Sequence, residues 1–394
     1  MKILVVGAGI AGSGAAYMLA HDGHDVCVVD AVKEPYAGGY QILFDRTAQQ
    51  VIRQIGAQNL VNDLSTPTAA ITVMRGKKEL TTISTQGYRS ARRGDLVGAI
   101  ARYAATKVPF HYGRELIGIE HTMSGVTARF ADGTAEPYDL IIGADGLNST
   151  VRRLAVEVDR SFLYENGRHN LWVNVPGRLA GTGEAAILFG DGVGAMVFPY
   201  TDQDETLVLT SINLGAGHHD GSGLLPIATG LLESSGPRFT PFAEHVRTAT
   251  ADQIRVTKFA QIRAPRWHSR NVVLLGDAAH CIDPLSGAGA HGGLVGGAVF
   301  AEELRRTPDD VAGAATRYTR RLRPFVRSAQ LVTAGLMERA TAHGIRQRLS
   351  ADLPLVGAAL AARRPDVPQH SYATTQTRPL SGRPAAGRNG AFHD

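Results

Sequence analysis

Two glycine-containing turns, far apart in the chain, constrain its fold more than any other feature. The first is the segment 7–12, Gly-Ala-Gly-Ile-Ala-Gly, which follows an apolar run at 2–6 and opens a helix expected over 11–20. The second is Gly276-Asp277, which follows another apolar run at 271–275. A short apolar run that ends in a glycine turn is typical of a strand in a nucleotide-binding domain. The chain is therefore expected to return to such a domain far downstream of its first turn.

The first turn has the pattern G-x-G-x-x-G between a strand and a helix. Gly7 permits the tight turn, Gly9 lets the backbone approach a pyrophosphate, and Gly12 lets the helix pack closely on the strand. A second strand at 26–29 ends on Asp30, whose carboxylate can accept both hydroxyls of an adenosine ribose. A glycine-rich helix start without a ligand would not need these elements in register. The predicted dinucleotide site contains Gly7, Gly9, Ile10, Ala11, Gly12 and Asp30.

Two further segments extend this pattern beyond what an NAD-binding domain has. The segment 139–152 contains Asp145-Gly146, and the segment 271–304 contains Gly276-Asp277 and a small-residue helix expected from about Gly287 to Leu304. With the first turn, these segments resemble the three fingerprints of the class A FAD-dependent monooxygenases, a family of aromatic hydroxylases similar to p-hydroxybenzoate hydroxylase and the tetracycline-inactivating monooxygenases. The resemblance covers roughly residues 1–310. It changes the expected cofactor from NAD to FAD.

The resemblance implies roles for individual residues. Asp277 would hydrogen-bond the FAD ribityl chain, and Asp145-Gly146 would lie near the pyrophosphate. Arg93, which opens a helix expected over 93–105, matches the family arginine on the flavin side of the cofactor. The helix expected at Gly287 would direct its N-terminus at the pyrimidine edge of the ring, with Pro284 beside the reacting face. The implied FAD-binding residues are Arg93, Asp145, Gly146, Gly276, Asp277, Pro284, Gly287, Gly289 and Ala290.

The chain also departs from the family pattern. Ala31 follows Asp30 where the family usually has Glu-Arg, so the guanidinium that often covers the adenine is missing. His291 stands where Asn or Ser is common, and we assign it no catalytic role. No other histidine is assigned as an acid or base, because each fits a structural role at least as well.

The resembled family reduces FAD with NAD(P)H, adds O2 to form a flavin hydroperoxide, and transfers its distal hydroxyl to an electron-rich substrate. We therefore expect an FAD-dependent monooxygenase of secondary metabolism, with NAD(P)H as a transient reductant, that hydroxylates an aromatic or polycyclic, phenolic or polyketide-like small molecule. One alternative is a flavin oxidoreductase of the same fold that performs dehydrogenation or Baeyer-Villiger oxidation. Another is a flavin-binding protein without turnover. The choice between NADH and NADPH and the oligomeric state stay open.

The order of the expected elements predicts an α/β fold. A Rossmann-like FAD-binding domain is interleaved with a mixed β-sheet substrate domain, and a long C-terminal helix follows. At 394 residues the chain exceeds the size at which one hydrophobic core stops growing, which favours two domains. We expect the FAD-binding domain at 1–70, 93–160 and 255–310, the substrate domain at 71–92 and 161–254, a C-terminal helical segment at 311–364, and a disordered tail at 365–394.

Strands after residue 163 alternate in a way that indicates a substrate pocket. Trp172 and Asn174 share one face of their strand, as do Met196, Phe198 and Tyr200 of another. One of these faces is expected to line a mostly apolar pocket, with Asn174 and Tyr200 orienting a phenol or carbonyl. The alternative is that these side chains pack against helices behind the sheet. Alternation alone does not distinguish the two faces.

Composition disfavours several classes of function. The net charge of +5 comes without a basic stripe that interleaves aromatic residues, so we expect no nucleic-acid partner. Only Cys27 and Cys281 are present, and His218-His219 lacks a set of ligands at metal spacing, so we expect no metal. No segment is long and apolar enough to span a bilayer, and the first turn explains the apolar N-terminus better than a signal peptide does. We therefore predict a cytoplasmic protein without integral membrane association.

Overall fold

The computed structural model describes most of the chain. Residues 1–35, 40–123, 125–156, 162–177, 184–199, 204–213, 221–283 and 286–341 are described. The predicted site residues Tyr200 and Pro284 lie outside these ranges, as do the pair His218-His219 and the tail predicted at 365–394.

The first sheet is six-stranded and carries the glycine turns. Its five neighbouring strands β8, β2, β1, β12 and β21 are parallel, and β20 adds an antiparallel edge. Strands β12 and β21 are wholly buried apolar runs, as expected for the centre of a parallel sheet covered on both faces. The bounds are β1 (Lys2–Val6), β2 (Asp25–Asp30), β8 (Phe110–Tyr112), β12 (Leu140–Gly143), β20 (His268–Ser269) and β21 (Val272–Leu274).

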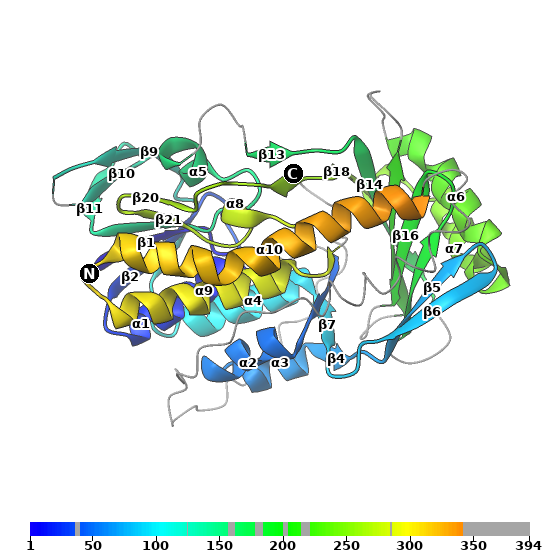
Figure 1. The fold of residues 1–394 in the computed structure, drawn as a ribbon, viewed down its shortest axis with the longest axis horizontal. Coiled ribbons are helices and arrows are strands. Elements are labelled where there is room, and N and C mark those ends of the chain that lie inside the picture. The colour runs from blue at the N-terminus through cyan, green and yellow to red at the C-terminus, as the bar shows by residue number, and fades with distance from the viewer. Residues whose placement is uncertain are drawn as a thin grey trace.

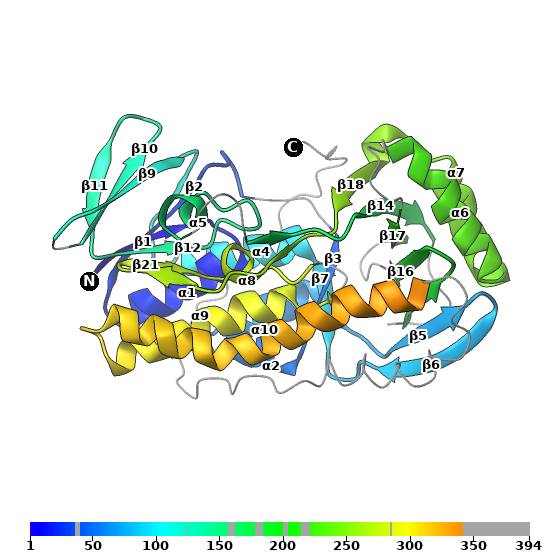
Figure 2. The same cartoon turned by 45° about the horizontal axis from the view of Figure 1, so that its top comes forward.

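Helices α1, α9 and α10 lie together on one side of this sheet (Figures 1 and 2). Helix α9 approaches α1 closely at Gly297, where the lack of a side chain makes room. A Cβ added there would lie only 3.3 Å from the Cβ of Ala15. Helix α10 is tied to α9 by ion pairs, in which the buried Glu303 accepts from Arg321 at 2.6 Å and from Arg317 at 3.0 Å. The helices of this part are α1 (Ile10–His21), α2 (Arg46–Gln54), α3 (Gln58–Asp63), α4 (Arg93–Ala104), α5 (Thr150–Ala155), α8 (Asp277–His280), α9 (Gly289–Arg306) and α10 (Val311–Thr341).

The second sheet has seven strands in the order β18-β14-β17-β16-β15-β5-β6. All neighbours are antiparallel except β15 and β5. Helices α6 and α7 cover its outer face, where Leu171, Val173 and Val197 join their apolar side chains (Figure 2). The bounds are β5 (Ala70–Arg75), β6 (Lys78–Ser84), β14 (Arg168–Pro176), β15 (Glu184–Phe189), β16 (Val193–Pro199), β17 (Glu205–Asn213), β18 (Ile254–Lys258), α6 (Leu225–Ser234) and α7 (Thr240–Arg247).

The predicted α/β architecture, with two interleaved sheets and a long C-terminal helix, is confirmed. Strand pairing differs from the expected domains at two short segments. Strand β7 (Arg89–Arg92) pairs with β3 and β4 in a separate sheet, and β18 pairs with β14 of the second sheet. Both strands lie where the chain passes from one main sheet to the other. The local sequence there does not indicate which strand each one will pair with. The remaining strands are β3 (Gln41–Phe44), β4 (Ser65–Pro67), β9 (Leu116–His121), β10 (Val126–Phe130), β11 (Ala135–Tyr138), β13 (Leu163–Tyr164) and β19 (Gln261–Ile262).

Helix starts also differ slightly from expectation. The helix expected at Gly287 begins at Gly289, because Gly287 has φ +62° and Ala288 stands at the N-cap position. The C-terminal helix begins at Val311 and is described as far as Thr341. A proline at position 324 lies inside it.

Candidate active site

A pocket of about 400 Å³ lies between the carboxyl ends of the first sheet's strands and the inner face of the second sheet. The turns that follow β1, β12 and β21 contribute Gly9, Gly146 and Gly276 to its wall. In an open parallel sheet, ligands bind beyond the carboxyl ends of the strands. The three predicted fingerprints therefore meet at the edge where a ligand is expected.

The glycines in this wall leave room for a cofactor backbone. A Cβ added at Gly9, Gly146, Gly287 or Gly289 would meet no atom within 4 Å. By contrast, a Cβ at Gly7 would lie 2.4 Å from the carbonyl oxygen of Ala144, and φ at Gly7 is +109°. Gly7 thus lets two turns approach one another, while Gly9 faces open space. This arrangement fits a pyrophosphate held between the turns.

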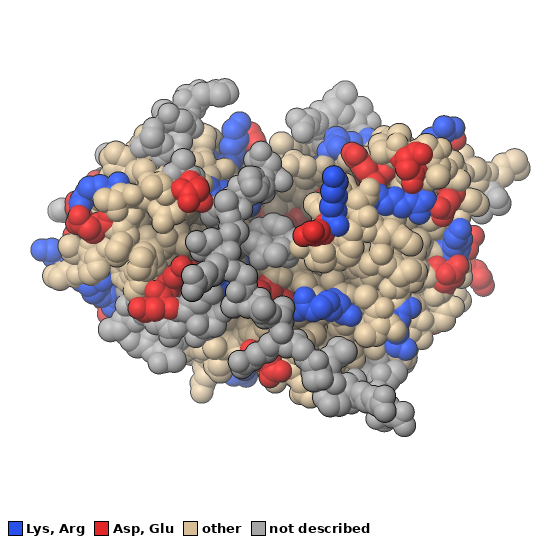
Figure 3. Space-filling model, turned by 180° about the vertical axis from the view of Figure 1, so that it is seen from behind, with Lys and Arg blue, Asp and Glu red and all other residues tan. Residues whose placement is uncertain are grey.

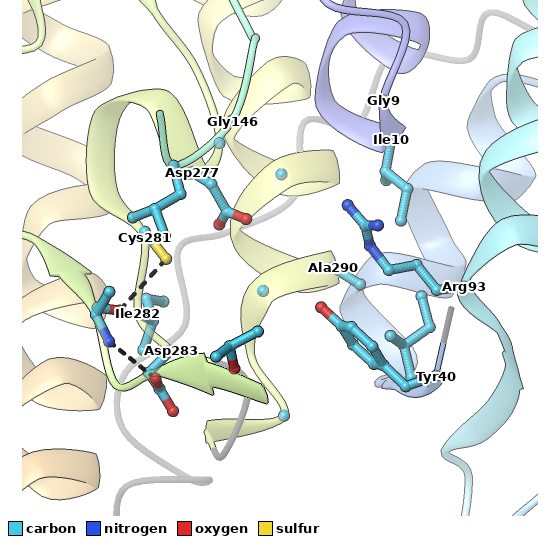
Figure 4. A pocket seen from close by; sticks show the side chains of 18 of the residues that line it. Gly9, Ile10, Tyr40, Arg93, Gly146, Asp277, Cys281, Ile282, Asp283 and Ala290 are labelled. Carbon is cyan, nitrogen blue, oxygen red and sulfur yellow. Dashed lines mark hydrogen bonds between the residues drawn. The ribbon is translucent and has the colours of Figure 1, made fainter. Parts of the chain in front are cut away.

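Asp277 and Arg93 face one another across the pocket (Figure 4). The carboxylate of Asp277 is exposed to the pocket yet lies deep within the protein, and this burial raises its pKa. The guanidinium of Arg93 and the thiol of Cys281 act in the opposite direction. A carboxylate in this position can accept hydrogen bonds from hydroxyl groups, and the role of Asp277 toward the cofactor stays a prediction.

Two predicted cofactor-binding acids accept hydrogen bonds from nearby backbone N–H groups. The carboxylate of Asp30 accepts hydrogen bonds from the N–H groups of Ala8 at 2.8 Å and Val32 at 3.1 Å. The carboxylate of Asp145 accepts from the N–H groups of Thr150 at 2.7 Å and Val151 at 3.1 Å, and so holds the start of α5. Neither carboxylate lines the pocket, although Gly146 beside Asp145 does.

The inner face of the second sheet supplies an apolar wall. Trp172, Met196 and Phe198 line the pocket, so the predicted substrate face is turned toward the cofactor half. Tyr40 stacks on Trp172 with ring centroids 4.2 Å apart, and the indole N–H donates to the hydroxyl of Thr257 at 2.9 Å. The predicted orienting residue Asn174 shares the strand face of Trp172 but does not line the pocket, and Tyr200 lies outside the described residues.

Several pocket residues were not predicted from the sequence. Arg255 and Thr257 alternate with the apolar Ile254 and Val256, which is a strand signal that points the two polar side chains to one face. Tyr40 carried no signal of its own, because its contact with Trp172 joins the segment just before β3 to the distant strand β14. The other unpredicted lining residues include Gln41, Ile42, Leu43, Asn148, Leu207, Leu209, Lys258, Ile282 and Asp283.

The adjacent residues His280 and Cys281 point in different directions. The His280 ring packs on Trp267, with centroids 4.6 Å apart, and its Nε2 lies 3.3 Å from the hydroxyl of Tyr318. Burial lowers the pKa of His280 to about 4, so the ring is neutral near pH 7. Cys281 lines the pocket instead, and burial raises the pKa of its thiol well above the usual value. The two side chains therefore do not form a reactive pair.

The first fingerprint and the FAD expectation agree with a comparison to known families. A family profile described as an FAD binding domain matches residues 1–295. The chain belongs to this FAD-binding family. FAD is thus its cofactor, and the predicted change from NAD to FAD is confirmed.

Relatives of the chain are named as monooxygenases. It is 27% identical over 365 residues to monooxygenase CTB7 of Cercospora beticola, with 85% of this chain and 86% of the relative covered. It is 26% identical over 349 residues to a flavin-dependent monooxygenase of Legionella longbeachae, with 84% and 87% covered. The predicted resemblance to class A flavin monooxygenases is confirmed.

Solved structures share the fold. Tetracycline destructase Tet(55) matches with a TM-score of 0.74 and 24% identity, covering 93% of this chain and 98% of that protein. Klebsiella pneumoniae HpxO in complex with FAD and uric acid matches with a TM-score of 0.76 and 21% identity, covering 91% and 93%. At these identities the similarity establishes the fold and leaves the substrate to be argued from this chain's own pocket.

Other features of the described residues bear on partners. No helix in the described part has both the length and the hydropathy to cross a membrane. The described residues include no group of three His, Cys, Asp or Glu side chains placed to hold a metal ion. On the face seen in Figure 3, Lys and Arg side chains lie among Asp and Glu side chains.

Proposed function

We propose that this FAD-dependent monooxygenase uses NAD(P)H and O2 to hydroxylate an aromatic or polycyclic small molecule of the phenolic or polyketide class. One observation carries the proposal: the apolar wall of Trp172, Met196 and Phe198 lines the same cavity as Asp277 and the start of α9. A flat ring packed on that wall would face the cofactor half of the cavity. Apolar pockets with few polar groups are typical sites for such molecules.

Some pocket residues would bind the cofactor, and others shape the substrate half of the pocket. When bound, FAD would supply the redox chemistry: two electrons from NAD(P)H, with one oxygen atom of O2 going to the substrate and the other leaving as water. The first turn of α9, at Gly289 and Ala290, presents unpaired N–H groups to the pocket and favours negative charge there. Asp277 would accept hydrogen bonds from cofactor hydroxyls, and Arg93 offers a cation opposite it.

The substrate half excludes water through its apolar side chains. Leu207 and Leu209 extend the wall formed by Trp172 and Phe198. Structures of the same fold hold ring-shaped ligands, as the uric acid complex of HpxO illustrates. This similarity supports a ring-shaped substrate for the present chain.

Turnover of candidate substrates by the FAD-loaded protein tests the proposal. Phenolic and polyketide compounds are screened for stimulation of NADPH and NADH oxidation, and products are analysed by mass spectrometry under ¹⁸O2. We expect at least one compound to gain a single labelled oxygen atom as a hydroxyl group. A product that has lost two hydrogens would indicate dehydrogenation instead, and a labelled ester or lactone would indicate Baeyer-Villiger oxidation. Oxidation that yields hydrogen peroxide with every compound would contradict the proposal.

A pair of neighbouring substitutions tests which sheet face binds substrate. Met196 lines the pocket, whereas Val197 is fully buried against α6 and α7. We expect Met196→Ala to weaken substrate binding by about tenfold, because a side chain that packs on the ring is removed. Val197→Ala is expected to lower the free energy of unfolding by about 2 kcal/mol and to leave substrate affinity unchanged. Equal substrate affinities for the two variants would place the substrate elsewhere.

A further inference from the structure

Strand β18 places two cations in the pocket wall. It is the edge strand of the second sheet, and its register sets Arg255 opposite Trp172. Ile254 and Val256 pack against the apolar cluster under α6 and α7. Because side chains alternate along a strand, Arg255 and Thr257 point to the opposite, inner face. Arg255 lines the pocket there, and Lys258 lines it at the end of the same strand.

These cations have no counter-ion among the described residues. Within the described part of the chain, the side chains of Arg255 and Lys258 take part in no ion pair or hydrogen bond, and only their backbone groups pair with β14. By contrast, Arg75 of β5 pairs with Asp191 at 3.0 Å. Both cations are exposed, which puts them at the open side of the pocket.

The acids of the pocket wall are engaged elsewhere. Asp277 lies opposite Arg93, in the cofactor half. Asp283 is buried and accepts a hydrogen bond from the N–H of Ala260 at 3.3 Å. The apolar substrate wall therefore carries an uncompensated positive charge beside Trp172. An anionic oxygen group is the ligand that such a site attracts, and an arginine can bind it with two parallel hydrogen bonds.

We propose that Arg255, assisted by Lys258, is a specificity-determining residue that binds a carboxylate on the substrate while the substrate ring packs against Trp172. This inference rests on the proposed function, because it takes the occupant of the substrate half to be the molecule that is oxygenated. The phosphates of NAD(P)H offer the same chemistry and are the competing source of an anion. Cations on an edge strand also discourage strand pairing between molecules, which is the structural alternative.

Binding measurements on the FAD-loaded protein test the inference without requiring turnover. Matched acid and amide pairs, benzoate and benzamide, 2-naphthoate and 2-naphthamide, and 9-anthroate with its amide, are titrated while the flavin absorbance is followed. We expect at least one acid to bind about tenfold more tightly than its amide. Arg255→Gln is expected to abolish that preference and leave amide binding unchanged, and Arg255→Lys to retain part of it.

Lys78→Gln is the matched control, because Lys78 is an exposed cation on β6, the opposite edge strand of the same sheet. It is expected to leave the acid preference intact. The inference is wrong if no acid binds more tightly than its amide, or if Arg255→Gln keeps the preference. It is also wrong if Arg255→Gln weakens NADPH binding alone, which would assign the cations to the cofactor phosphates, or only promotes aggregation. The proposed function has its own readout, labelled oxygen in a product, so the two can fail separately.

Discussion

Replacing Asp277 with alanine is expected to cost the protein most of its FAD. The wild-type protein should purify yellow, with FAD bound non-covalently. In Asp277→Ala, the carboxylate that faces the pocket opposite Arg93 is lost, and the other described acid of the pocket wall, Asp283, is buried and accepts from the N–H of Ala260. Loss of a charged acceptor for hydroxyl groups corresponds to an affinity decrease of about 100-fold. The FAD released by denaturation, measured per protein by absorbance, gives the occupancy directly.

Two variants control this experiment. Asp252→Ala removes an exposed carboxylate from the short helical turn before β18. Asp252 does not line the pocket, so this variant is expected to retain full flavin content. Asp277→Asn keeps an acceptor oxygen and removes the charge, so we expect intermediate FAD affinity. Wild-type flavin affinity in Asp277→Ala would show that this residue does not bind the cofactor.

Substitution of Gly12 by alanine is expected to prevent the FAD-binding domain from folding normally. The added Cβ would lie 2.0 Å from the carbonyl oxygen of Gly7, in the turn between β1 and α1. Neither backbone segment can move freely, because Gly7 donates to the carbonyl of Val29 at 2.8 Å and packs against Ala144. We expect the free energy of unfolding to fall by about 3 kcal/mol or more, seen as a loss of soluble protein and of the cooperative urea transition.

Gly9→Ala in the same turn is the matched comparison. Gly9 has φ −74°, which alanine adopts without strain, and an added Cβ would meet no protein atom within 4 Å. The variant should therefore fold, with an unchanged far-ultraviolet circular dichroism spectrum. Its FAD affinity should nevertheless fall by about tenfold or more, since the methyl group would occupy space that the pocket leaves for the cofactor. Normal flavin binding by Gly9→Ala would place the pyrophosphate away from this turn.

Much of the cofactor half could be predicted from the sequence, because its determinants are local. The tight turn at Gly7 and the close approach at Gly12 depend on backbone angles and on the absence of a Cβ, which are properties of single residues. The buried apolar runs before Gly9 and Gly276 indicate strands for the same reason. The structure that such features indicate does not depend on distant parts of the chain. The FAD prediction, which was based on them, was confirmed.

The roles of side chains at the pocket depended on contacts that local patterns do not contain. Asp145 was predicted near the cofactor, and nothing in the local sequence predicted that its carboxylate would accept from the N–H groups at the start of α5. The sequence around Tyr40 did not predict that its ring stacks on Trp172. In both cases the geometry of the folded chain decides the partner, because a hydrogen bond or a ring contact forms only with groups that the fold brings close.

The sequence by itself determined the glycine turns, the apolar strands before them, the FAD cofactor and the two-faced alternation of strands in the second sheet. Only the tertiary structure decided which face of that sheet meets the cofactor. The alternation of side chains along a strand places Trp172 and Met196 on one face and Leu171 and Val197 on the other. It does not indicate which of the two faces meets the cofactor. Helices α6 and α7, which follow later in the chain, cover the set that contains Leu171 and Val197. Trp172, Met196 and Arg255 are thereby left to face the pocket, because the outer face has already been buried.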